Sequence, residues 1–297
     1  MSVSPEGRAH TSYNIAGSSQ DSEEEFGKAF GRWSSSKSII DPYGPGNLQN
    51  IPSRGYGRII RSVFIPEDGY VILRGDYVQA EAVVVAYLIN DHRLIQAFHN
   101  HEDVHKLTAS TMFGVKVEDV TKEQRNVGKM IRHASNYSAG PAVLAKGLAC
   151  EMSEAKDLLS LYHRICPQLR RWHESIQEEL TKNNRTLTNL LGRKHRFLDR
   201  WGDGLFRSAY SYKPQSTVGD LLNFSLADFY YKYGDRWDIL LQLHDAFYIQ
   251  CRHGEIEEAT QCMKECMIRP IEVNNEEMVI DVDFAVGPNW ADLKEIK

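Results

Sequence analysis

The stretch YVILRGDYVQAEAVVVAYLI, residues 70–89, carries the strongest fold signal in the chain. It begins with a nearly continuous run of apolar and β-branched residues, which is typical of a buried strand. Asp76 falls at the end of that run, and residues 80–89 have the composition of a helix. The stretch therefore predicts a strand, a carboxylate at its end, and then a helix.

A second stretch, ILLQLHDAFYIQC at residues 239–251, has two apolar arms around a short polar centre. This pattern predicts a β-hairpin with His244 and Asp245 at its tip. Further along, IDVDFAVG at residues 280–287 reads as one more strand. Two of the predicted strands therefore end at an aspartate.

Long helical segments separate these strands. Residues 121–149 read as helical, with Thr121 as the N-cap, and residues 153–182 as a second helix interrupted near Pro167. Residues 1–46 are rich in Ser, Gly, Glu and Pro, and read as loops or extended segments. Long helices alternating with a few strands, without an internal repeat, predict an α+β fold.

The composition is that of a soluble globular protein. The chain has 297 residues with 42% apolar content, enough for one large core or two modest ones. Its five cysteines have neither disulfide nor zinc-site spacing, so reduced intracellular thiols are expected. The sequence has no apolar run close to the length of about 20 residues that spans a bilayer, and no recognisable signal peptide. A cytoplasmic protein without membrane contact is therefore expected. The net charge of -5 argues weakly against a general polyanion binder.

Asp76 and Asp245 are the candidate chemical centre. Strand ends present side chains to clefts, and if the two strands are neighbours, the two carboxylates converge. Paired carboxylates suit hard divalent cations such as magnesium, and two such ions can promote in-line phosphoryl transfer. Spacing alone favours an ordinary strand-end or turn residue at each position.

A cationic stripe is the second candidate feature. Arg125, Lys129, His133 and Tyr137 follow one another at intervals of four residues, which places them along one face of a helix. Arginine and lysine can make charge-assisted bonds to a triphosphate, and a ring further along can stack on a sugar or base. In isolation, such a stripe is more often a solvated helix face.

Other signatures are weak or missing in the sequence. It contains neither a GxxxxGK[ST] loop nor a GxSxG elbow, so the Walker-type ATPase and serine hydrolase classes lose their main support. The neighbouring His99, His101 and His105 lack the HExxH pattern of a zinc site. Lys213 and Gln215 flank Pro214 at a proline-marked break and offer a candidate minor-groove contact.

Taken together and in order, these stretches resemble the family A DNA polymerases. DYVQAE (76–81), RNVGKMIRHASNY (125–137) and LHDAF (243–247) resemble the family's motifs A, B and C. NLQNIP (47–52) matches a family signature, and GRWSSS (31–36) resembles its GRLSSS. The resemblance covers roughly residues 8–295 and includes GRKHRF (192–197), FRSAYSYKPQST (206–217) and VGPNW (286–290).

The resemblance implies the right-hand polymerase fold. In that fold an antiparallel palm sheet carries the metal carboxylates and a helical subdomain forms the fingers. The implied segments are a lead-in to the palm (1–46), palm with motif A (47–110), fingers with the motif B helix (111–200), and palm with the motif C hairpin and C-terminal strand (201–297).

The resemblance also implies roles for single residues. Asp76 and Asp245 would hold two Mg²⁺ ions, with the backbone carbonyl of Tyr77 as a further ligand, and Glu81 would exclude a ribose 2′-hydroxyl. The residues that would bind the incoming deoxynucleotide are Arg125, Lys129, His133, Tyr137, Glu81, His105 and Gln79. Those that would contact primer–template DNA are Arg32, Asn50, Arg207, Gln215 and His244.

The sequence departs from the family at several positions. His133 stands where the family has Phe or Tyr, and Ala246 replaces the acidic residue that follows the motif C aspartate. These changes bear on rate and fidelity more than on reaction type. Because no counterpart of a thumb or an exonuclease precedes the matching region, we expect a separate polypeptide that supplies them, as in a phage-type split polymerase, a minimal distributive enzyme, or a piece excised from a longer enzyme. The host would be a bacterium or a virus-infected cell.

The functional prediction is a template-directed DNA polymerase that uses deoxynucleoside triphosphates and lacks proofreading. One alternative is a non-catalytic nucleic-acid-binding subunit that keeps the fold, and another is a relative of the single-subunit RNA polymerases. Glu81 at the gate position argues against the RNA polymerase. Asp76 and Asp245 argue against the non-catalytic subunit, because converging carboxylates repel each other when no metal is bound.

Overall fold

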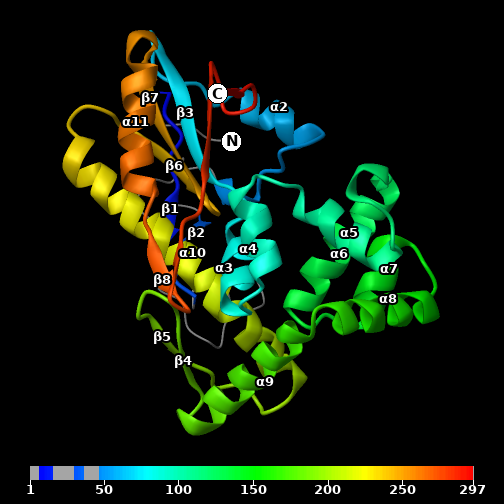
Figure 1. The fold of residues 1–297 in the computed structure, drawn as a ribbon. Helices are drawn as coiled ribbons and strands as arrows, with labels where there is room; N and C mark the ends of the chain where they lie inside the picture. Colours follow the sequence, from blue (N-terminus) through cyan, green and yellow to red (C-terminus); the bar gives the residue numbers. More distant parts are fainter. Residues whose placement is uncertain (1–6, 16–29, 37–46, 297) are drawn as a thin grey trace. The chain divides into compact units, whose positions relative to one another are not determined.

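Asp76 lies in a strand of a five-stranded antiparallel sheet, and Asp245 lies in the turn between two other strands of it. Figure 1 shows strands of this sheet. Two of its strands form the predicted hairpin, with His244 and Asp245 as the residues between them. The strand that contains Asp76 lies directly beside this hairpin, so the two predicted strands are neighbours. The strand order is β11 (Lys294–Ile296), β10 (Val282–Gly287), β3 (Tyr70–Tyr77), β7 (Ala246–Arg252) and β6 (Ile239–Leu243).

The computed structural model describes residues 7–15, 30–36 and 47–296, and its helices and antiparallel sheets confirm the α+β class. Much of the predicted lead-in at 1–46 lies outside the described residues; within it, β1 (Ser12–Asn14) pairs with β2 (Ser34–Ser36). The predicted palm and fingers boundaries stay predictions. The chain divides into two units: unit 1 is Met1–Ala80, Gln215–Ile271 and Val279–Lys297, and unit 2 is Glu81–Pro214 and Glu272–Met278.

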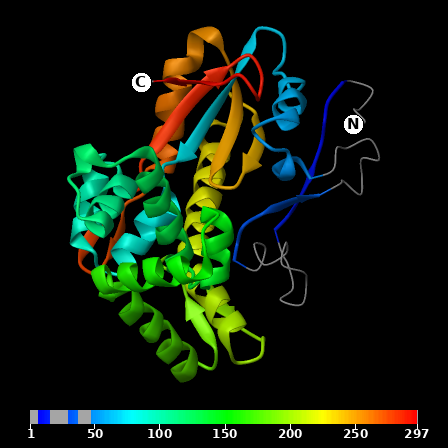
Figure 2. The ribbon, with the colours of Figure 1, turned by 90° about the vertical axis from the view of Figure 1, so that its right-hand side faces the viewer.

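Unit 1 packs helices against both faces of its sheet. Gly75 lies on the α11 face, where a Cβ would meet Met267 Sδ at 2.6 Å, so a larger residue here would displace the buried Met267 side chain. Because neighbours along a strand point to opposite faces, Asp76 lies on the face away from α11. Figure 2 shows α2 on that opposite side. The helical elements of unit 1 are η2 (Leu48–Asn50), α2 (Tyr56–Ser62), η4 (His253–Glu255), α11 (Ile256–Met267) and, from Gln215 onward, α10 (Asp203–Tyr233).

Unit 2 is mostly helical. Its α5 and α6 touch at Gly128, where a Cβ would lie 2.6 Å from the carbonyl oxygen of His105. No helix in the described parts of the chain has the length and apolarity needed to cross a membrane. The elements of unit 2 are α3 (Ala80–Leu88, from Glu81 onward), α4 (His92–His99), α5 (Val104–Phe113), η3 (Val117–Asp119), α6 (Lys122–Asn136), α7 (Pro141–Leu148), α8 (Met152–Ile165), α9 (Pro167–Lys182), β4 (Thr186–Thr188), β5 (Lys194–Arg196), α10 as far as Pro214, β8 (Ile271–Val273, from Glu272 onward) and β9 (Glu276–Met278).

The start of α6 follows its local signal. Thr121 is the N-cap, as predicted: its side-chain oxygen accepts the Gln124 N–H at 3.2 Å, and Gln124 Oε1 accepts the Thr121 N–H at 3.0 Å. The helix predicted over 121–149 is divided, because α6 ends at Asn136 and α7 begins with Pro141. A proline suits the first turn of a helix and not its interior, so it marks the new start.

Two other prolines differ in effect. Pro167 opens α9, and the predicted interruption is found there. The break predicted at Pro214 is wrong, because α10 continues through it. An interior proline costs about 3 kcal/mol, but tertiary contacts hold the adjacent turns: the Tyr212 hydroxyl donates to the Arg193 carbonyl at 2.6 Å, and Ser216 is fully buried.

Candidate active site

Three acidic residues meet at one end of the unit 1 sheet. Asp76 in β3 pairs in register with Ala246 of β7 on one side and with Asp283 of β10 on the other. Asp245 directly precedes Ala246, and its carbonyl oxygen accepts the Tyr77 N–H at 3.2 Å. The strand pairing therefore gathers carboxylates from three segments that are far apart in the sequence. Asp283 was not among the predicted site residues.

Burial and like charge raise the pKa of Asp76 to about 6. Burial contributes most, and the charge of Asp245 acts in the same direction. Arg74 opposes this, with Nη1 at 3.8 Å from Asp76 Oδ2, and Asp283 raises the pKa further. Because the charged carboxylate is disfavoured here, a proton or a cation nearby would stabilise this end of the sheet.

The donors at this end fit a hard divalent cation. Carboxylate oxygens are the ligands that magnesium prefers, and magnesium keeps several waters, so a full cage of protein ligands is not needed. Over residues 7–15, 30–36 and 47–296, no three or more His, Cys, Asp or Glu side chains are grouped so that they could hold a metal ion. The ring of Tyr77 lies on the other face, where its hydroxyl donates to the Met267 carbonyl at 2.7 Å. Its predicted metal contact, through the backbone carbonyl, stays a prediction.

We expect Asp76 to make the free energy of unfolding depend on pH. Its folded pKa of about 6 exceeds the usual 3.8, so the folded protein binds more protons between these values. Stability should therefore fall as pH rises through this window. Without divalent cations, Asp76→Asn should unfold at a higher temperature than wild type near pH 7, with the difference closing near pH 4. Thermal unfolding with and without magnesium measures this, and a difference independent of pH would contradict it.

A buried chain of amides holds the turn that carries Asp245. Gln242 Nε2 donates to the His244 carbonyl at 3.1 Å, and Gln242 Oε1 accepts from Gln49 Nε2 at 2.8 Å. Gln49 Oε1 in turn accepts the Ser35 N–H at 2.9 Å. The sequence prediction missed both glutamines. Both are buried: Gln49 is 9% exposed and Gln242 is 4% exposed. A glutamine inside the apolar arm ILLQL was the available signal, because a buried amide needs partners.

His244 occupies the turn itself. Its φ of 57° lies in the left-handed region, as a tight two-residue connection requires. Partial burial lowers the pKa of its imidazole; Asp245 acts against this, while Arg32 and Arg61 add to it. The ring is therefore neutral near pH 7, with one nitrogen as donor and the other as acceptor.

The cationic stripe in unit 2 lies on α6. Arg125 is half-buried, Lys129 and His133 are exposed, and Tyr137 is the C-cap. The close contact between α5 and α6 brings His105 near the stripe. Burial, followed by the charges of Arg132 and Arg125, lowers the pKa of His105 to about 4, so its ring is neutral near pH 7. Arg132, 3% exposed, is a further cation that the sequence prediction missed.

Asp103 orients Arg125. Arg125 Nε donates to Asp103 Oδ2 at 2.5 Å, while Asp103 Oδ1 accepts the N–H groups of His105 and Lys106, both at 3.0 Å, at the start of α5. Burial alone would raise the pKa of Asp103, but these hydrogen bonds and the Arg125 charge outweigh it and lower the pKa. Asp103 thus stays ionised and links Arg125 to α5.

Glu81 and Tyr137 are brought together across unit 2. The Tyr137 hydroxyl donates a short hydrogen bond to Glu81 Oε2. The His133 ring lies edge-on to Tyr137, with ring centroids 5.5 Å apart at 89°. The Glu81 carboxylate is therefore held in one position beside two rings of the motif B helix.

The remaining predicted residues lie in several places. Gln79 is exposed in the short connection before α3, with a φ of 49°. Asn50 is exposed on η2, and Arg207 is exposed on α10. Gln215 is half-buried on α10, and Arg32 is half-buried, with its Cγ near Gly219. The DNA contacts of these residues stay predictions.

Comparisons with known proteins agree with this geometry. The family model described as DNA polymerase family A matches residues 1–292. DNA polymerase I of Chloroflexus aurantiacus is 31% identical, over 98% of this chain and 30% of the relative's own length. Thermostable DNA polymerase I of Thermus aquaticus is also 31% identical, over 97% of this chain and 33% of the relative's own length. A solved structure described as the POL domain of Pol1 from M. smegmatis in complex with DNA primer-template and dNTP has a TM-score of 0.82 and 29% identity, covering 98% of this chain and 49% of that one. The chain spans about a third of the length of these curated relatives.

Proposed function

We propose a function for this chain from its membership, which the family model shows, in DNA polymerase family A. The chain would add deoxynucleoside triphosphates to a primer 3′ end, under the direction of a template, by two-metal phosphoryl transfer. The observation that carries this proposal is the meeting of Asp76, Asp245 and Asp283 at one end of the sheet, where the pKa of Asp76 is raised to about 6. A packed sheet gains nothing from gathering like charges, whereas a cation-dependent reaction needs them.

Asp76 and Asp245 would hold the metal ions. Two magnesium ions, when bound, supply activation of the primer hydroxyl and stabilisation of the leaving pyrophosphate. The chain contributes the position of the carboxylates. The hydrogen bond from the Tyr77 N–H to the Asp245 carbonyl links the hairpin turn to β3, and Gln242 Nε2 donates to the His244 carbonyl of the same turn. Ala246 in place of an acidic residue leaves both ligands present.

Arg125, Lys129 and His105 would bind the incoming triphosphate. The contact with Asp103 uses one of the five N–H donors of Arg125 and so fixes the plane of the guanidinium, while the other donors can address phosphate oxygens. His105, neutral near pH 7, would donate a hydrogen bond without adding charge. The exposed His133 ring would pack on the sugar, and Gln79 would lie near the nucleotide.

We expect Glu81→Ala to weaken discrimination against ribonucleotides. A steric gate fills the space that a 2′-hydroxyl needs, and Glu81 would be that gate. The Tyr137 hydroxyl donates a hydrogen bond to Glu81 Oε2, which would hold the carboxylate in position. The ratio of kcat/KM for a deoxynucleotide over its ribonucleotide should fall about 10- to 100-fold, the usual effect of one group in a pocket. Tyr137→Phe is the matched control, with a smaller loss. An unchanged ratio in Glu81→Ala would place the gate elsewhere.

We expect Gln242→Leu to slow nucleotide addition about tenfold, as loss of a group that orients metal ligands does. Its matched control is Gln250→Leu, because Gln250 is equally buried but bonds to Asp238 and to the Glu67 N–H. Both changes leave buried partners unsatisfied and should lower the free energy of unfolding by about 1–3 kcal/mol. Urea unfolding and single-turnover extension separate the effects. Equal slowing in both variants would contradict a special role for Gln242.

Primer extension by the purified chain, with magnesium and deoxynucleotides, tests the proposed function. The proposal includes a separate polypeptide that supplies thumb and exonuclease parts, so the assay is repeated with a thumb-bearing polypeptide added. Template-directed extension in either assay supports the proposal, and more nucleotides added per binding event in the second supports the split arrangement. DNA binding without extension in both assays would favour a non-catalytic subunit.

A further inference from the structure

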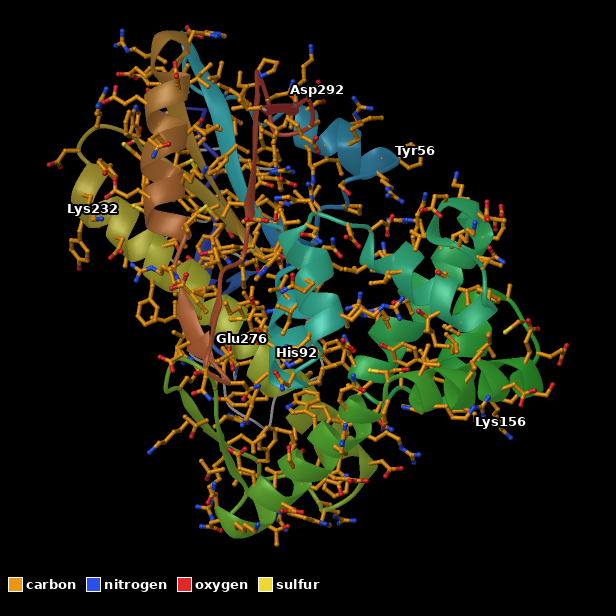
Figure 3. All side chains as sticks on the ribbon, in the orientation of Figure 1. Tyr56, His92, Lys156, Lys232, Glu276 and Asp292 are labelled. Carbon is orange, nitrogen blue, oxygen red and sulfur yellow. The ribbon has the colours of Figure 1, made fainter. Side chains whose placement is uncertain are left out.

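α2 is an amphipathic helix whose apolar side faces outward. Its large apolar residues, with Val63 at the C-cap, follow the spacing i, i+3, i+4, i+7 that places side chains on one helix face. Figure 3 shows Tyr56 at the outer end of this helix, away from the sheet of unit 1. The exposed fractions are 87% for Tyr56, 65% for Ile59, 36% for Ile60 and 62% for Val63, and Ile65, two residues beyond Val63, is 69% exposed. We call these five residues the α2 stripe.

The opposite side of α2 is anchored to unit 1. Arg61 donates Nε and Nη2 to the Ile51 carbonyl at 3.1 and 2.7 Å, and its guanidinium lies 4.3 Å from the centroid of the Trp290 ring. Gly57 packs so closely that a Cβ would lie 2.2 Å from the Pro52 carbonyl oxygen. A glycine and an arginine thus face inward, so the helix is held with its apolar stripe in solvent.

This arrangement is what a docking helix needs. Single exposed apolar residues are ordinary, but a contiguous group of them marks an interaction site. The i, i+3, i+4, i+7 pattern is the one by which a helix lies in an apolar groove. The rim of the stripe is basic: Arg54 is exposed, and Arg58, although it donates to Asp292 at 2.9 Å, keeps 66% of its side chain exposed.

We propose that the α2 stripe docks into an apolar groove with an acidic rim on a second, different polypeptide. Charge complementarity with Arg54 and Arg58 favours this occupant. A second copy of the chain fits less well, because a two-fold contact through the stripe would bring the same arginines together. The proposal concerns a surface that carries none of the residues assigned to catalysis, so it stands or falls separately from the polymerase activity.

The test has a capture step and a binding step. Ile59→p-benzoylphenylalanine in the full chain, expressed in the cells that make it, is irradiated beside a control at Tyr231, which is 84% exposed on α10. A polypeptide cross-linked only from Ile59 is then purified and titrated against the purified chain. We expect Ile59→Asp to raise Kd at least about tenfold, as for a central apolar anchor. Arg54→Glu should raise it several-fold, and added salt should weaken binding, whereas Tyr231→Asp should leave Kd unchanged.

Each other result overturns the proposal. One such result is that no polypeptide is cross-linked from Ile59. The other is that Ile59→Asp, shown by circular dichroism to be folded, binds the purified polypeptide with an unchanged Kd. Dimerisation in sedimentation that Ile59→Asp abolishes would assign the stripe to a second copy. Binding to phosphatidylcholine–phosphatidylserine vesicles that the same variant abolishes would assign it to a membrane surface.

Discussion

Asp245→Asn is expected to slow nucleotide addition by at least about 10³-fold without unfolding the protein, the scale of losing a group that stabilises transition-state charge. The substitution keeps the shape of the side chain and removes one negative charge from the place where the cations would bind. Asp245 also raises the pKa of Asp76, so the variant relieves repulsion between the two carboxylates. Without metal it should unfold at the same temperature as wild type or a higher one.

The measurement is single-turnover extension of a labelled primer, run beside circular dichroism. Asp292→Asn is the matched control, because Asp292 is an exposed aspartate of the same unit that pairs with Arg58 instead of joining the carboxylate group. It should extend primers at the wild-type rate. Asp76→Asn should repeat the loss seen for Asp245→Asn. Full activity in either site variant would contradict the metal assignment, whatever the family relationship.

The elements that carry the site were predictable because their signals are local. The strand before Asp76 and the hairpin around Asp245 follow from apolar runs and turn residues within short windows. Asp283 was missed although its strand was predicted. Its position opposite Asp76 depends on the register between β3 and β10, which long-range pairing sets and no short window contains. The bond between Gln49 and Gln242, 193 residues apart, is hidden for the same reason.

Tertiary contacts explain why the break predicted at Pro214 is wrong and why the α2 stripe faces solvent. Pro214 is a breaker by its local chemistry, yet buried contacts on both sides carry α10 through it. The apolar spacing around Ile59 is the pattern of a helix face turned to a core, and only the inward contacts of Arg61 and Gly57 show that this face points to solvent. Periodicity identifies which residues share a face, whereas packing decides where that face points.

Lys129→Ala is expected to lower kcat/KM for deoxynucleotide addition about 10²- to 10³-fold, the scale of losing one charged contact to a phosphoryl group in transfer. Lys129 is exposed on the same side of α6 as Arg125, near His105. Its ammonium group would balance charge that grows on the triphosphate as the leaving bond breaks. Since that interaction is stronger in the transition state than in the bound substrate, kcat should fall and not KM alone.

The matched control is Lys156→Ala, an exposed lysine on α8 of the same unit, which should leave kcat/KM within about twofold of wild type. Lys129→Arg keeps the charge and should recover part of the rate, which a purely structural role would not produce. Pre-steady-state extension over a range of nucleotide concentrations separates kcat from KM. An unchanged kcat/KM in Lys129→Ala would remove the α6 stripe from triphosphate binding. The metal assignment would survive that result, because the aspartate variants test it on separate residues.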